Sequence, residues 1–242
     1  MHKKIMLPLV MILLSTTACI GSLPGFLTNL MLMGTSSVVE APPIETAVEV
    51  VSSSANPYEQ FSYFRLDDGA WVLGVPDAPI TIVEFADFNC PHCQSYKPTM
   101  DQIVWQYVLQ GMANYEFRPF PILGDSSVEY AKLAICAGDL TGAGLWYASD
   151  ILFDQAQSGA SPLRAEEAVL GTLQIDFSAM NHCAEYVPMI EINRALAAES
   201  GVAGTPSIRV RYNGGELETI PGYEHGGGVP LAVLEDIITE AN

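Results

Sequence analysis

Residues 84–93 read EFADFNCPHC, and the interpretation of the whole chain begins with this stretch. Its first residues end an apolar, β-branched run from Pro79 to Phe85, which predicts a buried strand. After Cys93, apolar residues recur at helical spacing to about residue 111. The two cysteines of the stretch are therefore expected where a strand passes into a helix.

This position predicts a redox-active pair of thiols. Cys90 is expected at the first turn of the helix, where Pro91 is favourable because its missing N–H would have no helical partner. Free backbone N–H groups and the positive end of the helix dipole favour the thiolate, which is the attacking form of cysteine. His92 can stabilise this thiolate by hydrogen bonding or by its positive charge. Cys93, one turn further in, is expected to be the more buried, resolving thiol.

A stabilised thiolate makes the reduced pair the favoured form, so that its disulfide is a strong oxidant of substrate dithiols. The C-x-x-C spacing also occurs in zinc sites, which need a second pair of ligands. No other C-x-x-C, C-x-x-H or H-x-x-x-H pattern occurs, and the adjacent His182 and Cys183 are poorly placed to bind one metal together. Metal binding and a purely structural disulfide remain alternatives, and no metal or cofactor is expected.

Composition narrows the possible partners. The 242 residues suit one domain that carries an insertion, and 49% of them are apolar, which is enough for a substantial core. Lys and Arg total 10 against 28 Asp and Glu, giving a net charge of −18. Such acidity argues against nucleic acid as a partner and against binding anionic lipid through a basic patch.

The N-terminus resembles a targeting segment. His2, Lys3 and Lys4 precede an apolar core and the small-residue stretch 15–19. Ending at Cys19, this stretch resembles the lipobox of bacterial lipoproteins, in which the cysteine is lipidated, although Thr16 replaces the usual aliphatic residue. An uncleaved anchor that continues to about residue 33 is the alternative, and both place the rest of the chain outside the cytoplasm, in the cell envelope.

We interpret residues 1–19 as this signal or anchor segment, 20–65 as a flexible tether and 66–242 as a folded domain. Within the domain, helical patterns fill residues from about 124 to 198 and predict an all-helical insertion. The strand, helix, strand order before it predicts parallel pairing. The remaining elements are expected at Trp71–Gly74 and Tyr115–Phe120 (strands), Ser207–Tyr212 and Glu216–Ile220 (a hairpin through Asn213-Gly214-Gly215), and Leu231–Ile238 (a closing helix).

Three features together resemble the DsbA-like thiol-disulfide oxidoreductases: residues 84–93, the sequence GVAGTP at 201–206, and the helical stretch between them. The likeness covers about residues 71–241. It implies an α/β thioredoxin fold with an inserted all-helical domain, and an enzyme that donates disulfides to cysteine-containing polypeptides. It also implies a membrane redox partner that resets the disulfide.

The resemblance assigns roles to further residues. Thr205–Pro206 is implied to be a cis peptide bond beside the Cys90–Cys93 pair, with the Thr205 backbone exposed for strand-like pairing with a substrate peptide. An ordinary turn proline is the alternative. Glu84 matches a buried acid that moves protons to and from the resolving thiol, unless it reaches solvent at the strand end. Asp87 is expected to be solvated or to cap a loop.

Two further cysteines, Cys136 and Cys183, fall in the predicted insertion. They are expected to form a structural disulfide in an oxidising compartment, and some DsbA-like proteins are similar in carrying a second disulfide. A relay that exchanges with Cys90–Cys93 and a pair of buried free thiols are the alternatives.

Two rival functions stay open. The first is a disulfide isomerase or reductase of the same fold, kept reduced by a membrane donor. The second is a copper-binding chaperone that holds the metal at Cys90 and Cys93, with His92 nearby.

Overall fold

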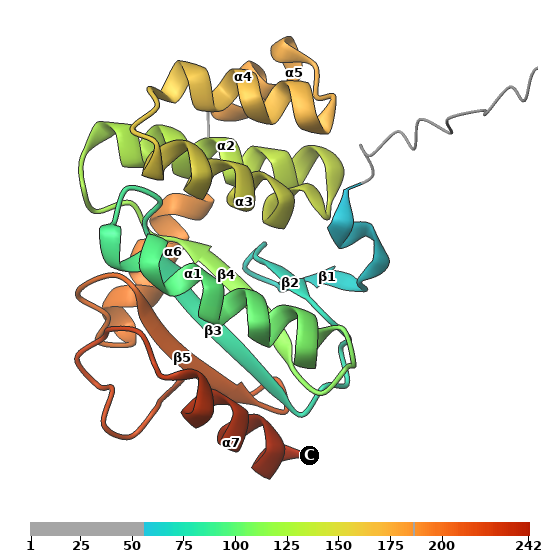
Figure 1. Ribbon diagram of the computed structural model, residues 1–242, viewed down its shortest axis with the longest axis vertical. Helices are drawn as coiled ribbons and strands as arrows, with labels where there is room; N and C mark the ends of the chain where they lie inside the picture. Colours follow the sequence, from blue (N-terminus) through green and yellow to red (C-terminus); the bar gives the residue numbers. More distant parts are fainter. Residues whose placement is uncertain (1–55, 186) are drawn as a thin grey trace, which may run out of the picture. The chain divides into compact units, whose positions relative to one another are not determined.

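The computed structural model describes residues 56–185 and 187–242 (Figure 1). The predictions for residues 1–55, which include the signal or anchor segment, the lipidation of Cys19 and most of the tether, lie outside this range. Among the described residues, no helix combines the length and the apolar character needed to cross a membrane.

One mixed sheet carries the fold, with strand order β1-β2-β4-β3-β5-β6. β3 pairs in parallel with β4, as predicted, and every other neighbouring pair is antiparallel. All seven residues of β3 are buried, as its apolar sequence indicates. The strands are β1 Tyr63–Arg65, β2 Trp71–Leu73, β3 Ile80–Ala86, β4 Asn114–Pro119, β5 Ser207–Tyr212 and β6 Glu218–Thr219.

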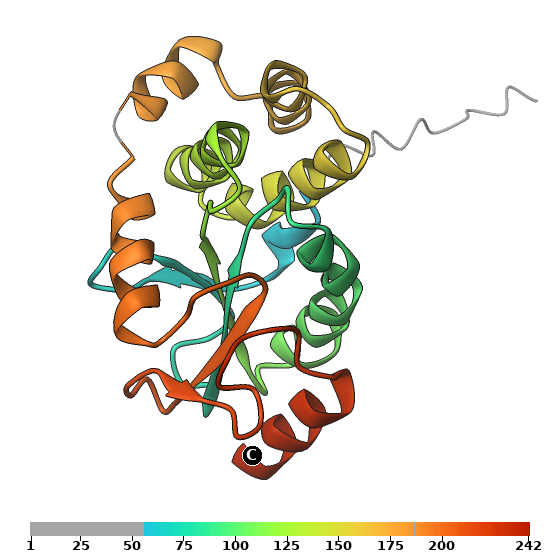
Figure 2. The same cartoon turned by 90° about the vertical axis from the view of Figure 1, so that its left-hand side faces the viewer.

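Helices cover both faces of this sheet and one of its ends. α1 and α7 lie on one face and α6 on the other, while α2 to α5 gather at the end where β4 leads into them (Figures 1 and 2). The helices are η1 Pro57–Gln60, α1 Pro91–Ile103, the π-helix η2 Val104–Val108, α2 Asp125–Thr141, α3 Gly144–Gln157, α4 Pro162–Leu173, α5 Phe177–Ala184, α6 Met189–Glu199 and α7 Leu231–Ala241. The α/β thioredoxin fold with an all-helical insertion is thereby confirmed.

Local sequence explains several boundaries. Pro91 occupies the first turn of α1, and Cys90 is its N-cap. Asn213 and Gly214 adopt φ values of 51° and 69° in the turn that joins β5 to β6, the conformation that favours Asn-Gly in tight hairpins. The hairpin is present, but its second strand is shorter than the predicted Glu216–Ile220.

A disulfide joins two helices of the insertion. Cys136 of α2 and Cys183 of α5 are bonded, with their Cα atoms 5.8 Å apart and a sequence separation of 47. Trp146 and Leu152 of α3 are buried in one hydrophobic core that also contains Cys136 and residues of β2 to β5. The insertion and the sheet therefore share a common core.

The prediction that the tether reaches residue 65 is wrong for residues 56–65. This segment forms η1 and β1, and β1 pairs with β2 at the edge of the sheet. The physical reason is aromatic burial: Tyr58 and Phe61 pack on Trp105, with ring centroids 5.7 and 5.0 Å away. Pro57 suits the start of a helix, although in the sequence it suggests a linker.

Candidate active site

The two thiols lie where β3 passes into α1. Cys90 precedes the first helical residue, and Cys93 lies one turn further along the same helix. Both are free thiols, and Cys90 is 6% exposed whereas Cys93 is fully buried at 0%. His92 is exposed on the first turn. The difference in burial agrees with an attacking Cys90 and a resolving Cys93.

A second segment, far along the chain, borders Cys90. The Thr205–Pro206 peptide bond is cis, and the Cys90 Sγ lies 3.3 Å from the carbonyl oxygen of Thr205. The backbone N–H of Gly227 donates a 2.7 Å hydrogen bond to the Pro206 carbonyl and so holds this loop from the other side. The structure thus brings the C-x-x-C pair and the cis-proline loop together.

Asp87 organises the turn before Cys90. Its carboxylate accepts hydrogen bonds from the backbone N–H groups of Asn89 (2.9 Å), Ile122 (2.8 Å) and Leu123 (3.0 Å). Asp87 is buried, so the expectation of a solvated side chain is wrong and that of a loop cap is confirmed. The same carboxylate ties the redox turn to the loop that leads into the insertion.

Glu84 lies inside β3 and does not reach solvent, since it is only 2% exposed. The Tyr115 hydroxyl donates a 2.5 Å hydrogen bond to its Oε2. Burial raises the pKa of Glu84 from 4.5 to about 7, although the hydrogen bond from Tyr115 and the positive charge of Lys97 oppose this rise. Glu84 therefore exchanges a proton near neutral pH, as a general acid or base in this pH range must.

Glu84 affects the ionisation of Cys93. Burial raises the pKa of the Cys93 thiol, and the negative charge of Glu84 raises it further. Cys93 therefore stays protonated near neutral pH.

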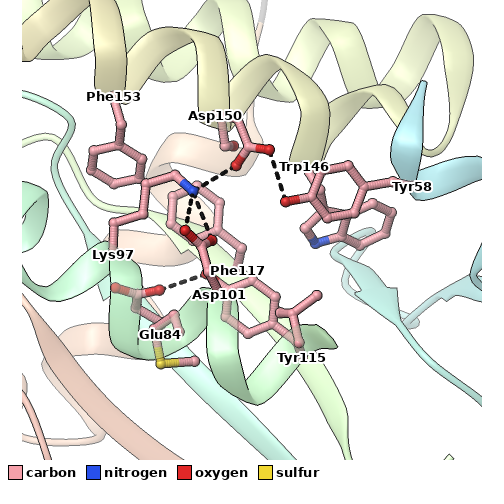
Figure 3. Close-up of a pocket in the computed structure, with 12 residues that line it drawn as sticks. Tyr58, Glu84, Lys97, Asp101, Tyr115, Phe117, Trp146, Asp150 and Phe153 are labelled. Carbon is pink, nitrogen blue, oxygen red and sulfur yellow. Dashed lines mark hydrogen bonds and ion pairs between the residues drawn. The ribbon is translucent and has the colours of Figure 1, made fainter. Parts of the chain in front are cut away.

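Sequence reasoning missed a charged cluster next to Glu84 (Figure 3). The Lys97 Nζ lies 2.7 Å from a carboxylate oxygen of Asp101 and 2.7 Å from one of Asp150. The second oxygen of Asp150 accepts a 2.9 Å hydrogen bond from the Tyr58 hydroxyl. The spacing of Lys97 and Asp101 by four residues is a visible helical signal. Nothing in the sequence connects either of them to Asp150 or Tyr58.

A buried dithiol at the start of a helix, bordered by a cis-proline loop, is typical of the thioredoxin superfamily, and the inserted helices α2 to α5 are typical of its DsbA-like members. The comparisons agree: a family described as thioredoxin matches residues 67–223, more than half of the chain, and the chain belongs to this family. The chain is accordingly an enzyme of thiol-disulfide exchange.

Among curated relatives, "Probable disulfide bond formation protein D" of Bacillus anthracis is 27% identical over 154 residues, which cover 58% of this chain and 69% of the relative. A solved thioredoxin-like oxidoreductase from Silicibacter pomeroyi is 26% identical with a TM-score of 0.55, covering 71% of this chain and 91% of its own. The thiol-disulfide exchange protein alpha-DsbA2 of Wolbachia pipientis is 25% identical with a TM-score of 0.53, covering 71% and 86%.

Proposed function

We propose that this enzyme works outside the cytoplasm and donates disulfides to cysteine-containing polypeptides through Cys90 and Cys93. The observation that carries the proposal is the 3.3 Å contact between the Cys90 Sγ and the Thr205 carbonyl oxygen. It places the more accessible thiol beside backbone that can pair with an extended substrate.

In the proposed reaction, a substrate thiolate attacks the Cys90 Sγ of the oxidised pair. The Cys90–Cys93 bond breaks, and Cys93 leaves with the electron pair and takes up a proton. A second substrate thiolate then attacks the substrate sulfur of the mixed disulfide, and Cys90 leaves as a thiolate. The substrate loses two electrons and the pair gains them, so a partner in the membrane must remove them again.

The supporting residues receive roles in this scheme. Pro91 starts the helix whose N–H groups face the Cys90 thiolate, and His92 adds a donor or a positive charge beside it. Glu84 exchanges the proton of Cys93, while Thr205 and Pro206 dock the substrate backbone. These assignments are proposals that rest on the positions of the five residues: Pro91 and His92 on the first turn of α1, Glu84 in β3, and Thr205 and Pro206 in the cis-proline loop.

Location and anchoring belong to the same proposal. The N-terminal pattern that ends at Cys19 favours export and attachment to a membrane, by lipidation or by an uncleaved anchor. The Cys136–Cys183 disulfide supports an oxidising compartment, because structural disulfides persist there and are rare in a reducing cytosol.

Electron flow in the opposite direction would make the enzyme a reductase or isomerase, with the same residues in the same places. A copper-binding role would use the same two thiols, because two cysteine thiolates are enough to hold Cu(I). The cis-proline loop beside Cys90 favours thiol exchange, because docking of a substrate backbone uses this loop and metal binding does not need it.

The decisive experiment is the reduction potential of Cys90–Cys93 in the purified protein, equilibrated with glutathione buffers and read by alkylation and mass spectrometry. A value of roughly −120 mV is expected for a disulfide donor. A value of roughly −270 mV would contradict the donor role, because such a pair works as a reductant. Cys90→Ser should abolish oxidation of a dithiol peptide, and retained activity would overturn the mechanism.

A further inference from the structure

A small cavity separates Glu84 from the charged cluster on α1 and α3 (Figure 3). It measures about 20 Å³, which is room for one water molecule. Polar groups from five elements line it: Tyr58 of η1, Glu84 of β3, Lys97 and Asp101 of α1, Tyr115 of β4, and Ser149 and Asp150 of α3. A water placed there would have the polar partners that a buried water needs.

A larger pocket of about 370 Å³ opens between α1 and α3. Lys97, Asp101 and Asp150 line this outer pocket as well as the inner cavity. The three side chains thus form a polar wall between Glu84 and the outer pocket. The outer pocket also contains Asp154, which does not line the inner cavity.

Ion pairs hold the three side chains of this wall together. Lys97 donates to both oxygens of Asp101, at 2.7 and 2.9 Å, and pairs with Asp150 of the insertion at 2.7 Å. Burial acts to lower the pKa of Lys97, but Asp150 and Asp101 outweigh this effect and raise it. Lys97 therefore remains positively charged across the physiological range.

The charges in the wall act on Glu84 with opposite signs. Burial, the largest influence, raises the pKa of Glu84; among the charges, Lys97 lowers it and Asp101 raises it. The other titratable groups near Glu84 or in this cavity are Tyr115 of β4, Tyr58 of η1, and Cys93 and Tyr96 of α1, and all four have a raised pKa. These four stay neutral near pH 7, which leaves Lys97 and Asp101 as the charges that act on Glu84. Burial also raises the pKa of Asp150, the third residue of the wall.

We propose that protons pass between Glu84 and solvent through this cavity, and that Lys97, held by Asp101 and Asp150, is the positioning residue that sets when Glu84 releases its proton. The proposal rests on the proposed thiol-exchange function and adds a role for the helical insertion, which supplies Asp150. Lys97 touches neither thiol in this scheme and acts only through Glu84.

The proton step can be followed when the mixed disulfide at Cys90 is resolved. The Cys93 thiol gives its proton to the Glu84 carboxylate, and the resulting thiolate attacks the Cys90 Sγ. The Cys90–Cys93 bond forms, and the bond from Cys90 to the partner sulfur breaks, so that the partner leaves as a thiolate with the electron pair. The proton then leaves Glu84 through the water in the cavity.

The test mixes the reduced protein with an excess of an aromatic disulfide that releases a coloured thiolate. The first release reports attack by Cys90, and the second, independent of reagent concentration, reports resolution by Cys93. The rate of the second release is expected to rise through about pH 7 in the wild type. Lys97→Met should move this rise upward by about one pH unit, because a nearby opposite charge is lost. Asp101→Asn should move it downward.

Two controls make the result specific. Lys97→Arg keeps the charge and should restore the wild-type profile, and Asp154→Asn, in the outer pocket only, should leave it unchanged. In a Glu84→Gln background, Lys97→Met should have no further effect on the profile. Unshifted profiles for both Lys97→Met and Asp101→Asn would overturn the proposal, as would shifts that persist without Glu84.

A second measurement covers variants that fold poorly. The infrared carbonyl band of protonated Glu84, identified by its loss in Glu84→Gln, can be titrated in wild type, Asp101→Asn and Lys97→Arg. A lower midpoint in Asp101→Asn supports the proposal, and an unchanged midpoint contradicts it. Failure of the wild type to release any coloured thiolate would instead contradict the proposed function itself, which keeps the two outcomes apart.

Discussion

The Sγ atom of Cys90 lies 3.3 Å from the carbonyl oxygen of Thr205, although 115 residues separate the two along the chain. Between them in sequence lie α1, β4, the whole insertion and α6. In the proposed function, this contact aligns the attacking thiol with the backbone that would receive a substrate chain. A substrate strand laid along Thr205 would place its own cysteine at Cys90.

Removal of the resolving thiol should trap the mixed disulfide between Cys90 and a substrate cysteine. In Cys93→Ser, Cys90 can still form a mixed disulfide, but the fully buried neighbour can no longer attack it. We expect a stable covalent complex with a single-cysteine peptide disulfide, visible as one added peptide mass. Cys90→Ser is the matched control and should accumulate no complex. Equal trapping by both variants would contradict the assignment of Cys90 as the attacking residue.

Glu84 should make stability depend on pH. Since burial raises the pKa of Glu84 from 4.5 to about 7, the folded protein holds a proton in this interval that the unfolded chain has lost. The free energy of unfolding should therefore fall as pH rises from about 4.5 to about 7, by about 3 kcal/mol in total. Glu84→Gln keeps an acceptor for Tyr115 and should lose this part of the dependence. Denaturant unfolding of both proteins at several pH values measures the difference.

The matched control is Glu167→Gln, at an exposed position on α4. Its free energy of unfolding should follow that of the wild type across the same pH range. If the difference between Glu84→Gln and wild type stays constant with pH, Glu84 does not exchange its proton near neutrality.

The disulfide in the insertion should stabilise the fold without taking part in thiol exchange. With a sequence separation of 47 between Cys136 and Cys183, loss of the bond is expected to lower the free energy of unfolding on the order of 4 kcal/mol in the chain-entropy model. Denaturant unfolding of the Cys136→Ala, Cys183→Ala double variant measures this loss. Its rate of dithiol oxidation per folded molecule should match the wild type. A reduced rate would favour the alternative in which this pair relays electrons.

The segment before β1 should be part of the folded unit. Phe61 is 6% exposed and packs edge-on against Trp105 at 5.0 Å. Phe61→Ala should therefore lower the free energy of unfolding by about 3–5 kcal/mol. Phe177→Ala removes an equal side chain that is 57% exposed, and it should cost less than about 0.5 kcal/mol. Similar losses from both variants would show that residues 56–61 do not pack as described.

The parts that could be predicted from the sequence are those that short-range patterns determine. The C-x-x-C pair with Pro91 places Cys90 at a helix start, and Asn213-Gly214 marks a hairpin, because backbone preferences act over a few residues. The fold class followed from the alternation of these patterns and from the resemblance at residues 201–206. α2 begins at Asp125, next to the predicted start of the insertion at about residue 124. The predicted end at about residue 198 includes α6, which lies on a face of the sheet.

The parts that escaped prediction depend on tertiary contacts. Tyr58 and Phe61 lie in a segment rich in Pro and Ser, and only their burial against Trp105 shows that they belong to the core. Asp150 lies 53 residues after Lys97, on a helix whose placement against α1 no spacing rule reveals. The capping role of Asp87 could be predicted, because a carboxylate in a loop suggests capping. Its burial could not, because it depends on hydrogen bonds from the backbone of residues 122 and 123.

The bonds of Asp87 have a consequence for how such enzymes diversify. The insertion leaves the thioredoxin part beside the loop that this carboxylate holds, and the chain that returns from it reaches Thr205 after α6. The loop before the insertion and the cis-proline loop after α6 thus flank the redox pair. If other helices replaced the inserted ones, the surface beside an incoming polypeptide would change while the two thiols and α1 stayed in place. New substrate polypeptides could then be bound without any change in the thiol chemistry.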